Sequence, residues 1–343
     1  MSQLLTILGP TACGKTAVAT RLAALFATER EASRVSGGFP AEIISADSRQ
    51  VFRGMDIGTG KDLADYDVAV RRGDSEELLH IPYHLIDIAE PGTKYSVFHF
   101  QRDFRRAYHD ICSRGRVPIL CGGTGLYVES VLRDYNLVEV PVNPELREQL
   151  EGKSLEELTA LLATYKRLHN TTDVDTARRA IRAIEIEEYY RQHGLSHTSE
   201  TPSTPETPST PIATESSLTI GLDVPRDLRR ERITARLQRR LQEENMTEEV
   251  QRLLDEGVPA EALLSYGLEY RYITLHLLGQ LTFDEMAHQL EIAIHQFAKR
   301  QMTYFRGMER RGVNIHWIDA TRPINDLSEE IFRIFLASFE EKQ

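Results

Sequence analysis

The amino-acid sequence predicts an α/β fold with a doubly wound parallel sheet. Short apolar runs alternate with longer helical patterns along most of the chain. Several of these runs end in a polar or glycine cluster, as parallel strands do at the ligand-binding edge of such sheets. The first run leads through a glycine-containing loop into a helical pattern, which is the arrangement of P-loop NTPase-like folds. These observations indicate a P-loop core with a small helical insertion and a helical C-terminal third.

The loop near the N-terminus fits the phosphate-binding pattern G-x-x-x-x-G-K-[ST]. Residues 4–8 before it are typical of a buried strand, and residues 17–26 after it of a helix. Backbone N–H groups at such a junction point toward an anion at the positive end of the helix. We expect Lys15 to reach the terminal phosphates of a nucleotide or pyrophosphate and Thr16 to hold a magnesium ion. The loop consists of Gly9, Pro10, Thr11, Ala12, Cys13, Gly14, Lys15 and Thr16.

Later apolar runs are predicted as further strands of the same sheet, at residues 41–46, 83–88, 117–121, 218–224 and 314–318. Helices are predicted over the last third, at residues 225–256, 283–311 and 324–339, with Gly257 and Gly312 as C-terminal caps. Ligands of such folds bind at the carboxyl ends of the strands. We therefore expect Asp47 and the glycine run 122–125 at the edge that carries the phosphate loop.

The chain is expected to divide into a core and an insertion. Residues 1–140 and 215–343 form the predicted P-loop core with its helical C-terminal part. Residues 141–197 show helical patterns without strands, with Asn143 and Ser154 as N-caps and an amphipathic helix over residues 178–191. Residues 198–214 carry a repeating Thr-Pro tract with little to bury, which predicts a flexible loop.

Composition limits the class of protein. Of 343 residues, 41% are hydrophobic and 27% are charged, which is typical of a globular chain with its own core. No apolar run approaches the ~20 residues of a membrane span, and the first strand begins too near Met1 for a signal peptide. We expect a cytoplasmic monomer without a membrane partner. The three cysteines lack C-x-x-C spacing, which favours free thiols over a disulfide or zinc site.

Charge is unevenly distributed around a net value of −11. Residues 226–240 hold seven arginines and two acids, and residues 299–311 hold five basic residues and one acid. Such stripes suit phosphate binding, although a solvated helix face gives the same pattern. Arg236 in the first stripe is a candidate for a pyrophosphate contact. Phe297 and Phe305 alternate with basic residues as in base-stacking surfaces, but their helical spacing favours core positions.

Asp47 begins a second cluster, at the end of a predicted strand. An aspartate near a phosphate loop has three available roles: magnesium ligand, general base or structural cap. Arg49 and Gln50 beside it carry planar groups that suit the edge of a nucleobase. The three glycines of residues 122–125 permit a ligand to approach the backbone closely, and they equally suit a tight turn.

In combination these segments resemble the tRNA isopentenyltransferase (tRNA dimethylallyltransferase) family. The matching stretches lie in order from residue 9 to residue 306: GPTACGKT, ISADSRQVFRGMDIGTGK, HLIDI, PILCGGTGLY, RRAIRAIE, the PR…RI..R helix and FAKRQMTYFR. The resemblance implies transfer of a dimethylallyl group from dimethylallyl pyrophosphate to the N6 amine of the adenosine 3′ of the tRNA anticodon, with release of pyrophosphate. Its partners are then tRNA, through the anticodon stem-loop, and dimethylallyl pyrophosphate.

The resemblance also implies roles for individual residues. Asp47 becomes the general base, and Lys15, Thr16 with Mg²⁺ and Arg236 stabilise the departing pyrophosphate. The residues implied in tRNA contact are Asp47, Ser48, Arg49, Gln50, Thr124, Arg178, Arg179, Arg182, Arg300 and Gln301. Two further implied segments depart from the family pattern: residues 265–270 differ from Ile-Gly-Tyr-x-[EQ], and residues 294–297 lack the usual Thr-Arg.

Other classes of protein share part of this pattern. A small-molecule P-loop kinase would use the same loop with ATP and would need no basic helix. An isopentenyltransferase acting on free AMP or ADP would share the loop and the base but need no anticodon-binding surface. A non-catalytic RNA-binding module would not need Lys15, Thr16 and Asp47 together. The basic segments 178–182 and 299–306 favour an RNA substrate.

Overall fold

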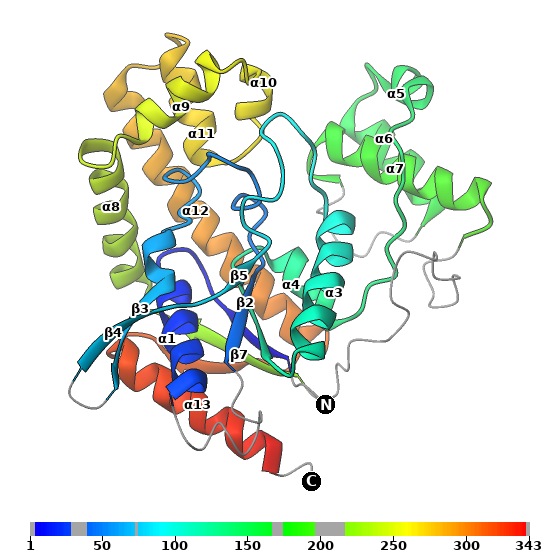
Figure 1. Cartoon of the computed structure of the whole chain (residues 1–343). Coiled ribbons are helices and arrows are strands. Elements are labelled where there is room, and N and C mark those ends of the chain that lie inside the picture. The colour runs from blue at the N-terminus through cyan, green and yellow to red at the C-terminus, as the bar shows by residue number, and fades with distance from the viewer. Residues whose placement is uncertain (1–3, 29–39, 73–74, 167–173, 196–216, 341–343) are drawn as a thin grey trace. The chain divides into compact units, whose positions relative to one another are not determined.

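The structure is a computed structural model that describes residues 4–28, 40–72, 75–166, 174–195 and 217–340 (Figure 1). The chain forms two compact units, which are described separately below. The larger comprises Met1–Asp134 with Thr207–Gln343, and the smaller comprises Tyr135–Glu206. The predicted Thr-Pro loop, residues 198–214, lies outside the described residues.

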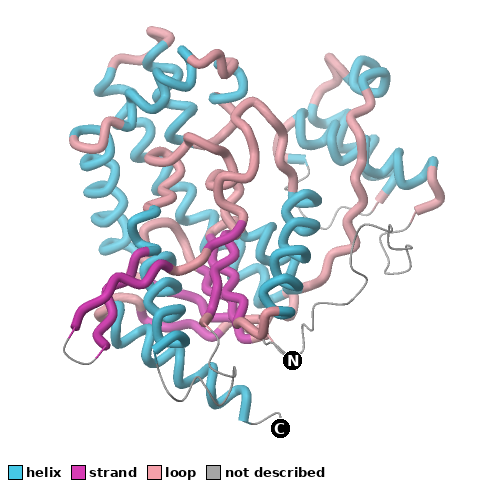
Figure 2. The backbone as a smooth tube through the Cα atoms, in the orientation of Figure 1, coloured by secondary structure: helices cyan, strands magenta, loops and turns pink. Residues whose placement is uncertain are grey.

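The larger unit contains a parallel sheet with helices around it (Figures 1 and 2). The sheet has six strands in the order β5-β2-β6-β1-β7-β8. All neighbouring strands in it are parallel, so the predicted parallel α/β sheet is confirmed. The strands are β1 (Leu5–Leu8), β2 (Ala41–Ser45), β5 (Tyr83–His84), β6 (Val117–Gly122), β7 (Leu218–Asp223) and β8 (His316–Asp319).

The strand predicted over residues 83–88 is only two residues long. Leu85 and Asp87 adopt φ values of 64° and 55°, which extended backbone does not allow. The N–H groups of Asp87 and Ile88 instead donate to the carbonyls of Gln50 and Val51. This part of the prediction was therefore wrong, and the segment forms a loop packed against the one that follows β2.

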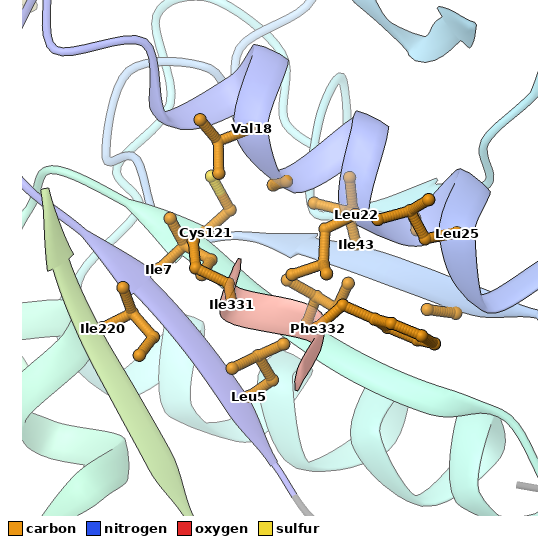
Figure 3. Close-up of a cluster of buried hydrophobic side chains, with 14 of the residues drawn as sticks. Leu5, Ile7, Val18, Leu22, Leu25, Ile43, Cys121, Ile220, Ile331 and Phe332 are labelled. Atoms are coloured by element: carbon orange, nitrogen blue, oxygen red, sulfur yellow. The ribbon is translucent and has the colours of Figure 1, made fainter. Parts of the chain in front are cut away.

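Helices cover both faces of the sheet, as a doubly wound fold requires. Leu5 and Ile7 point to the face covered by α1 (Lys15–Thr28) and α13 (Ile324–Glu340), and Figure 3 shows the cluster that they form with Val18, Leu22 and Phe332. Leu4 and Leu8 point to the opposite face. That face is covered by α3 (Val97–Ser113), α4 (Gly125–Leu132) and the C-terminal part of α12 (Phe283–Arg310).

A third cluster joins the N-terminal part of α12 to a group of shorter helices. These are α8 (Arg226–Gln242), α9 (Met246–Asp255), α10 (Ala260–Leu263) and α11 (Leu268–Leu277). A single helix over residues 225–256 was predicted, but Asn245 has a φ of 57° and separates α8 from α9. Gly257 and Gly312 have positive φ after α9 and α12, as predicted for C-terminal caps.

An antiparallel hairpin of β3 (Asp67–Arg72) and β4 (Ser75–His80) follows the 3₁₀ turn η1 (Leu63–Tyr66). The sequence analysis did not predict it. Val70 and the flanking Tyr66 and Ile81 join the core on the α1 face of the sheet. The hairpin thus extends the covering of that face.

The smaller unit contains α5 (Pro144–Leu150), α6 (Leu155–Tyr165) and α7 (Ala177–Gln192) around a core of its own. Both predicted N-caps are confirmed. The Asn143 side chain accepts from the N–H of Leu146, and Ser154 forms a capping box with Glu157. Across the part of the chain that the structure describes, every helix in either unit is too short or too polar to span a bilayer.

Candidate active site

The predicted phosphate loop connects β1 to α1. Val18 donates to the carbonyl of Gly14 at 3.0 Å, so the helix begins within the loop. Gly14 has a φ of 84°, a conformation that glycine adopts without steric cost. A Cβ on Gly9 would lie 2.9 Å from the backbone oxygen of Leu222, so the loop also packs closely on β7. The strand–loop–helix geometry of the prediction is present.

Lys15 and Thr16 occupy the first turn of α1, and both are half-buried. The ammonium group of Lys15 folds back over the loop and donates to the carbonyl of Pro10 at 2.8 Å. It also lies 3.9 Å from Sγ of Cys13. The positive charge of Lys15 is thus held against the loop that the motif assigns to phosphate.

Asp47 lies at the same edge of the sheet as the phosphate loop. Ser45 of β2 and Ile7 of β1 are both in register with Cys121 of β6, which lies between them. Asp47 and Gly9 each follow two residues later. Two strand spacings therefore separate their backbones, roughly 10 Å.

The thiol of Cys121 lies at this edge, close to both charges. Burial raises its pKa to about 12. The positive charge of Lys15 opposes that rise, and the negative charge of Asp47 adds to it. Cys121, on β6 between β1 and β2, therefore lies within the electrostatic reach of both Lys15 and Asp47. This is expected if the two charged groups belong to one site.

Hydrogen bonds shape the backbone around Asp47. The N–H of Arg49 donates to Oδ1 of Asp47 at 2.8 Å, and the N–H of Ser48 donates to Oγ1 of Thr124 at 3.1 Å. The Gln50 amide connects the end of β2 to the loop around Gly60. Its Oε1 accepts from the Ser45 hydroxyl at 2.8 Å, and its Nε2 donates to the carbonyl of Gly60 at 2.9 Å. Gln50 therefore holds the segment in place in this structure.

The glycine run after β6 is needed for close packing. A Cβ on Gly122 would lie 2.2 Å from the carbonyl oxygen of Ala46, and one on Gly123 would lie 2.7 Å from Nε2 of Gln301. The same Cβ on Gly123 would be 3.6 Å from Nζ of Lys15. These glycines let β2, the phosphate loop and α12 approach one another, a role beyond the turn and ligand approach considered from the sequence.

Two distant helices hold the phosphate loop at Thr11. Arg236 of α8 donates to the Thr11 hydroxyl at 2.5 Å. Gln301 of α12 accepts from the Thr11 N–H through Oε1 at 2.8 Å, and its Nε2 donates to the carbonyl of Gly123 at 2.8 Å. Burial and the neighbouring Arg240 lower the pKa of Arg236 to about 10, so its guanidinium remains charged at neutral pH. Arg236 thus lies at the phosphate loop, and its contact with pyrophosphate stays a prediction.

A small cavity lies beside Arg236, among α8, α9, α11 and α12. Burial raises the pKa of Glu269, which lines this cavity, and the nearby guanidinium groups of Arg236 and Arg240 oppose that rise. The Glu269 carboxyl group and Arg236, which contacts the phosphate loop, thus line the same cavity. The lining residues are Ile233, Arg236, Leu237, Arg240, Met246, Glu269 and Ile294.

The other basic residues of the larger unit differ in exposure. Arg49 is half-buried and donates to the carbonyl of Ser265 at 3.2 Å, and burial lowers the pKa of its guanidinium. Arg300 is exposed, 6.0 Å from the ring centre of Phe297. The core position expected for Phe297 was wrong, since its side chain is 39% exposed, whereas Phe305 is fully buried as expected. Arg300 and Phe297 form an exposed basic and aromatic pair on α12.

The three arginines of the smaller unit for which the resemblance implies tRNA contact lie on α7. Arg178 and Arg179 are exposed in its first turn, and Arg179 pairs with Asp175. Arg182 is bound within its own unit, where it donates to the carbonyl of Val140 at 2.8 Å and to Glu185 at 3.2 Å. Arg178 and Arg179 are therefore both exposed to solvent, and the charge of Arg179 is paired with that of Asp175.

The sequence analysis missed the buried residues that hold the loop over residues 51–61. Lys61 is 1% exposed, and its ammonium group donates to the carboxylates of Asp56 and Asp87. Glu249 of α9 accepts from three consecutive backbone N–H groups of the loop. No local signal links Glu249 to this loop, because Glu249 lies some 190 positions from its partners.

The donor set at the phosphate loop fits a magnesium ion shared with a ligand. The described residues contain no group of three or more His, Cys, Asp or Glu side chains placed to hold a metal. Mg²⁺ usually takes one or two protein oxygens and completes its shell with phosphates and water. The hydroxyl of Thr16, at the start of α1, is a suitable single ligand of this kind. None of the three cysteines forms a disulfide in the part of the chain that the structure describes.

Comparison with known proteins gives matches over nearly the whole chain. The family model described as IPP transferase matches residues 50–308. A tRNA dimethylallyltransferase 1 of Parabacteroides distasonis is 56% identical over 332 residues, 97% of each chain. A tRNA dimethylallyltransferase 2 of Porphyromonas gingivalis is 54% identical and covers 98% of this chain and 100% of its own.

A solved structure gives the same result. The crystal structure of the full-length tRNA isopentenylpyrophosphate transferase from Bacillus halodurans superposes with a TM-score of 0.63. It is 29% identical in sequence and covers 100% of this chain and 98% of its own. From the match of the family model, the near full-length similarity to these relatives and the shared fold, this chain belongs to the IPP transferase family.

Proposed function

We propose that this chain transfers a dimethylallyl group from dimethylallyl pyrophosphate to the N6 amine of the adenosine 3′ of the anticodon in tRNA. The observation that carries this proposal is the common edge of the sheet at which the phosphate loop and Asp47 lie, with β6 between them. The names of relatives up to 56% identical over nearly the full chain support the same reaction.

Asp47 is the proposed general base. The lone pair of the adenine amine is delocalised into the ring, so the amine is a weak nucleophile and must lose a proton as the new bond forms. A bond forms between N6 and the carbon of the dimethylallyl group that carries the pyrophosphate oxygen. The C–O bond at that carbon breaks, and its electron pair leaves with the pyrophosphate. The proton passes to the Asp47 carboxylate, which the N–H of Arg49 orients.

The phosphate loop is the proposed binding site of the leaving pyrophosphate. Negative charge on that group grows as the C–O bond breaks, and donors already in place stabilise it most effectively. The loop N–H groups, Lys15 and Arg236 supply these donors. Thr16 would hold the magnesium ion, which supplies further positive charge to the pyrophosphate when bound.

The tRNA contacts are proposed on two surfaces. One consists of the segment around Asp47, Thr124 and the exposed Arg300 in the larger unit. The other is the helical insertion, residues 141–197, which presents Arg178 and Arg179. The target base must leave its stack to reach Asp47, which costs less in a loop than in a duplex. A monomer and a cytoplasmic location remain predictions.

Acceptor choice tests the proposal. The protein is mixed with radiolabelled dimethylallyl pyrophosphate and either an anticodon stem-loop or AMP. We expect label on the stem-loop only, and none when guanosine replaces the target adenosine. Label on AMP alone would instead identify an enzyme of free nucleotides. ADP release from ATP with a nucleoside acceptor, without prenyl transfer, would identify a kinase.

A further inference from the structure

Glu249 places a negative charge inside the loop that follows Asp47. Its Oε2 accepts from the N–H groups of Asp56 at 2.8 Å and Ile57 at 2.7 Å, and its Oε1 accepts from the N–H of Gly58 at 3.1 Å. The Tyr270 hydroxyl donates to Oε1 at 2.5 Å. Glu249 is 7% exposed, so four donors meet one carboxylate away from water.

The three backbone N–H groups and the Tyr270 hydroxyl would lose a hydrogen-bond partner without the Glu249 carboxylate. A buried backbone N–H without a partner costs about 1–3 kcal/mol, and hydrogen bonds to a charged acceptor are stronger than neutral ones. Burial and the nearby Glu249 carboxylate raise the pKa of Tyr270 well above its ordinary value, so its hydroxyl remains a donor. A Cβ on Gly58 would lie 2.8 Å from the Tyr270 ring, so the ring fixes the distance between loop and helix.

The loop held by Glu249 in turn holds the Asp47 segment. The carbonyl of Gly60, two residues beyond Gly58, accepts from Nε2 of Gln50 at 2.9 Å. The other amide atom of Gln50 accepts from Ser45 at the end of β2. Gln50 thus connects the segment 45–50, which carries Asp47, to the loop at Gly60. The N–H groups of that loop are in turn bound to Glu249 of α9.

We infer that Glu249 is a positioning residue for the reaction: its carboxylate fixes loop 56–60 and, through Gln50, the placement of Asp47. This inference rests on the proposed function for its catalytic part only. Glu249 touches neither the phosphate loop nor Asp47 by any hydrogen bond among the described residues, so its effect passes through the loop.

The test compares Glu249→Gln with Glu248→Gln in the full chain. Both remove one negative charge from the first turn of α9, but Glu248 is exposed. The glutamine amide at position 249 has one acceptor atom, and its NH₂ group faces backbone donors. We expect hydrogen exchange of the peptide spanning residues 51–61 to speed up about ten- to a hundredfold in Glu249→Gln only, the effect of unpairing one or two buried donors.

Kinetics separate positioning from general destabilisation. In Glu249→Gln we expect the single-turnover rate of prenyl transfer to tRNA to fall about tenfold or more. Affinity for inorganic pyrophosphate, measured by calorimetry, should change less than twofold, because α8 and α12 hold the phosphate loop independently. Equal losses in both quantities would indicate general destabilisation and overturn the inference.

Three further outcomes are informative. Unchanged exchange at residues 51–61 would overturn the anchoring itself, and faster exchange with an unchanged transfer rate would overturn its link to Asp47. If Glu249→Gln does not fold, Tyr270→Phe removes one donor and should give the same pattern with a smaller amplitude. Its failure to do so would equally count against the inference. Absence of transfer by the unmodified chain contradicts the proposed function but leaves the exchange result valid.

Discussion

Arg236 donates a hydrogen bond to the side chain of Thr11 across 225 positions of sequence, at 2.5 Å. Thr11 lies within the phosphate loop, whereas Arg236 comes from a helix that begins only after the last-but-one strand of the sheet. The contact brings a buried positive charge to a loop whose backbone already favours anions. It makes α8 part of the proposed pyrophosphate site.

Arg236→Ala should lower the rate of prenyl transfer by about 10²–10³-fold, the usual effect of removing one donor that stabilises developing negative charge. Steady-state kinetics with varied dimethylallyl pyrophosphate would measure it. Arg230→Ala is the matched control, because it removes the same charge from an exposed position of α8. Similar losses in both variants would contradict a specific role for Arg236.

Asp47→Asn should reduce prenyl transfer by ~10²–10⁴-fold, because the amide cannot take the proton from the adenine amine. Binding of tRNA should change little, since the side chain keeps its size and its oxygen can still accept from Arg49. Single-turnover transfer and filter binding on the same preparation would separate the two effects. Transfer at the normal rate would remove Asp47 from its proposed role.

Arg300→Ala should weaken tRNA binding and reduce the slope of log affinity against log salt concentration, by about one phosphate contact. The guanidinium is exposed on α12 beside Phe297 and is free to meet an RNA backbone. Arg333→Ala, on an exposed position of α13, is the control for net charge. Parallel salt series for Arg300→Ala and the unmodified chain would show that this residue does not contact the RNA.

We expect Glu42 to make the free energy of unfolding depend on pH in acid. Burial alone raises its pKa, but hydrogen bonds from Arg114, His84 and Arg116 outweigh burial and lower the pKa to about 2. A lowered pKa in the folded state stabilises the fold above the unfolded value near 4.5, and this contribution disappears as pH falls toward 2. Its upper limit is about 3 kcal/mol.

Urea unfolding of the unmodified chain and Glu42→Gln between pH 6 and pH 2 tests this contribution. The difference in the free energy of unfolding should be largest above about pH 5 and should shrink as Glu42 becomes protonated. Comparison of the two proteins cancels the titration of other carboxylates. A difference that stays constant over the whole range would show that the Glu42 carboxyl titrates with an ordinary pKa.

The sequence predicted the elements whose signals are local. The strand, loop and helix around Gly14 follow one motif, and Asn143 and Ser154 cap their helices through residues only three positions away. The two-residue β5 was overestimated because positive φ at Leu85 is not visible in an apolar run. Asn245 did carry a signal, since asparagine tolerates left-handed backbone, but it lay inside an otherwise continuous helical pattern.

The residues that support the site could not be predicted in the same way. The amide of Gln301 binds Thr11 and Gly123, which lie 290 and 178 positions away, and the sequence did not indicate these contacts. The tRNA contact implied for Gln301 stays a prediction. Glu249 looked like one of many acids on a helix. Such contacts depend on how distant elements pack, and a single sequence without an alignment carries no record of that packing.

Arg300 and Gln301 are consecutive residues of one rigid helix, the first in solvent and the second against the phosphate loop. A tRNA that binds Arg300 therefore contacts the residue directly before Gln301, which holds the phosphate loop. We expect the two substrates to bind with thermodynamic coupling, each changing the dissociation constant of the other by the same factor. The affinity for dimethylallyl pyrophosphate would then depend on whether tRNA is already bound, before the transfer step takes place.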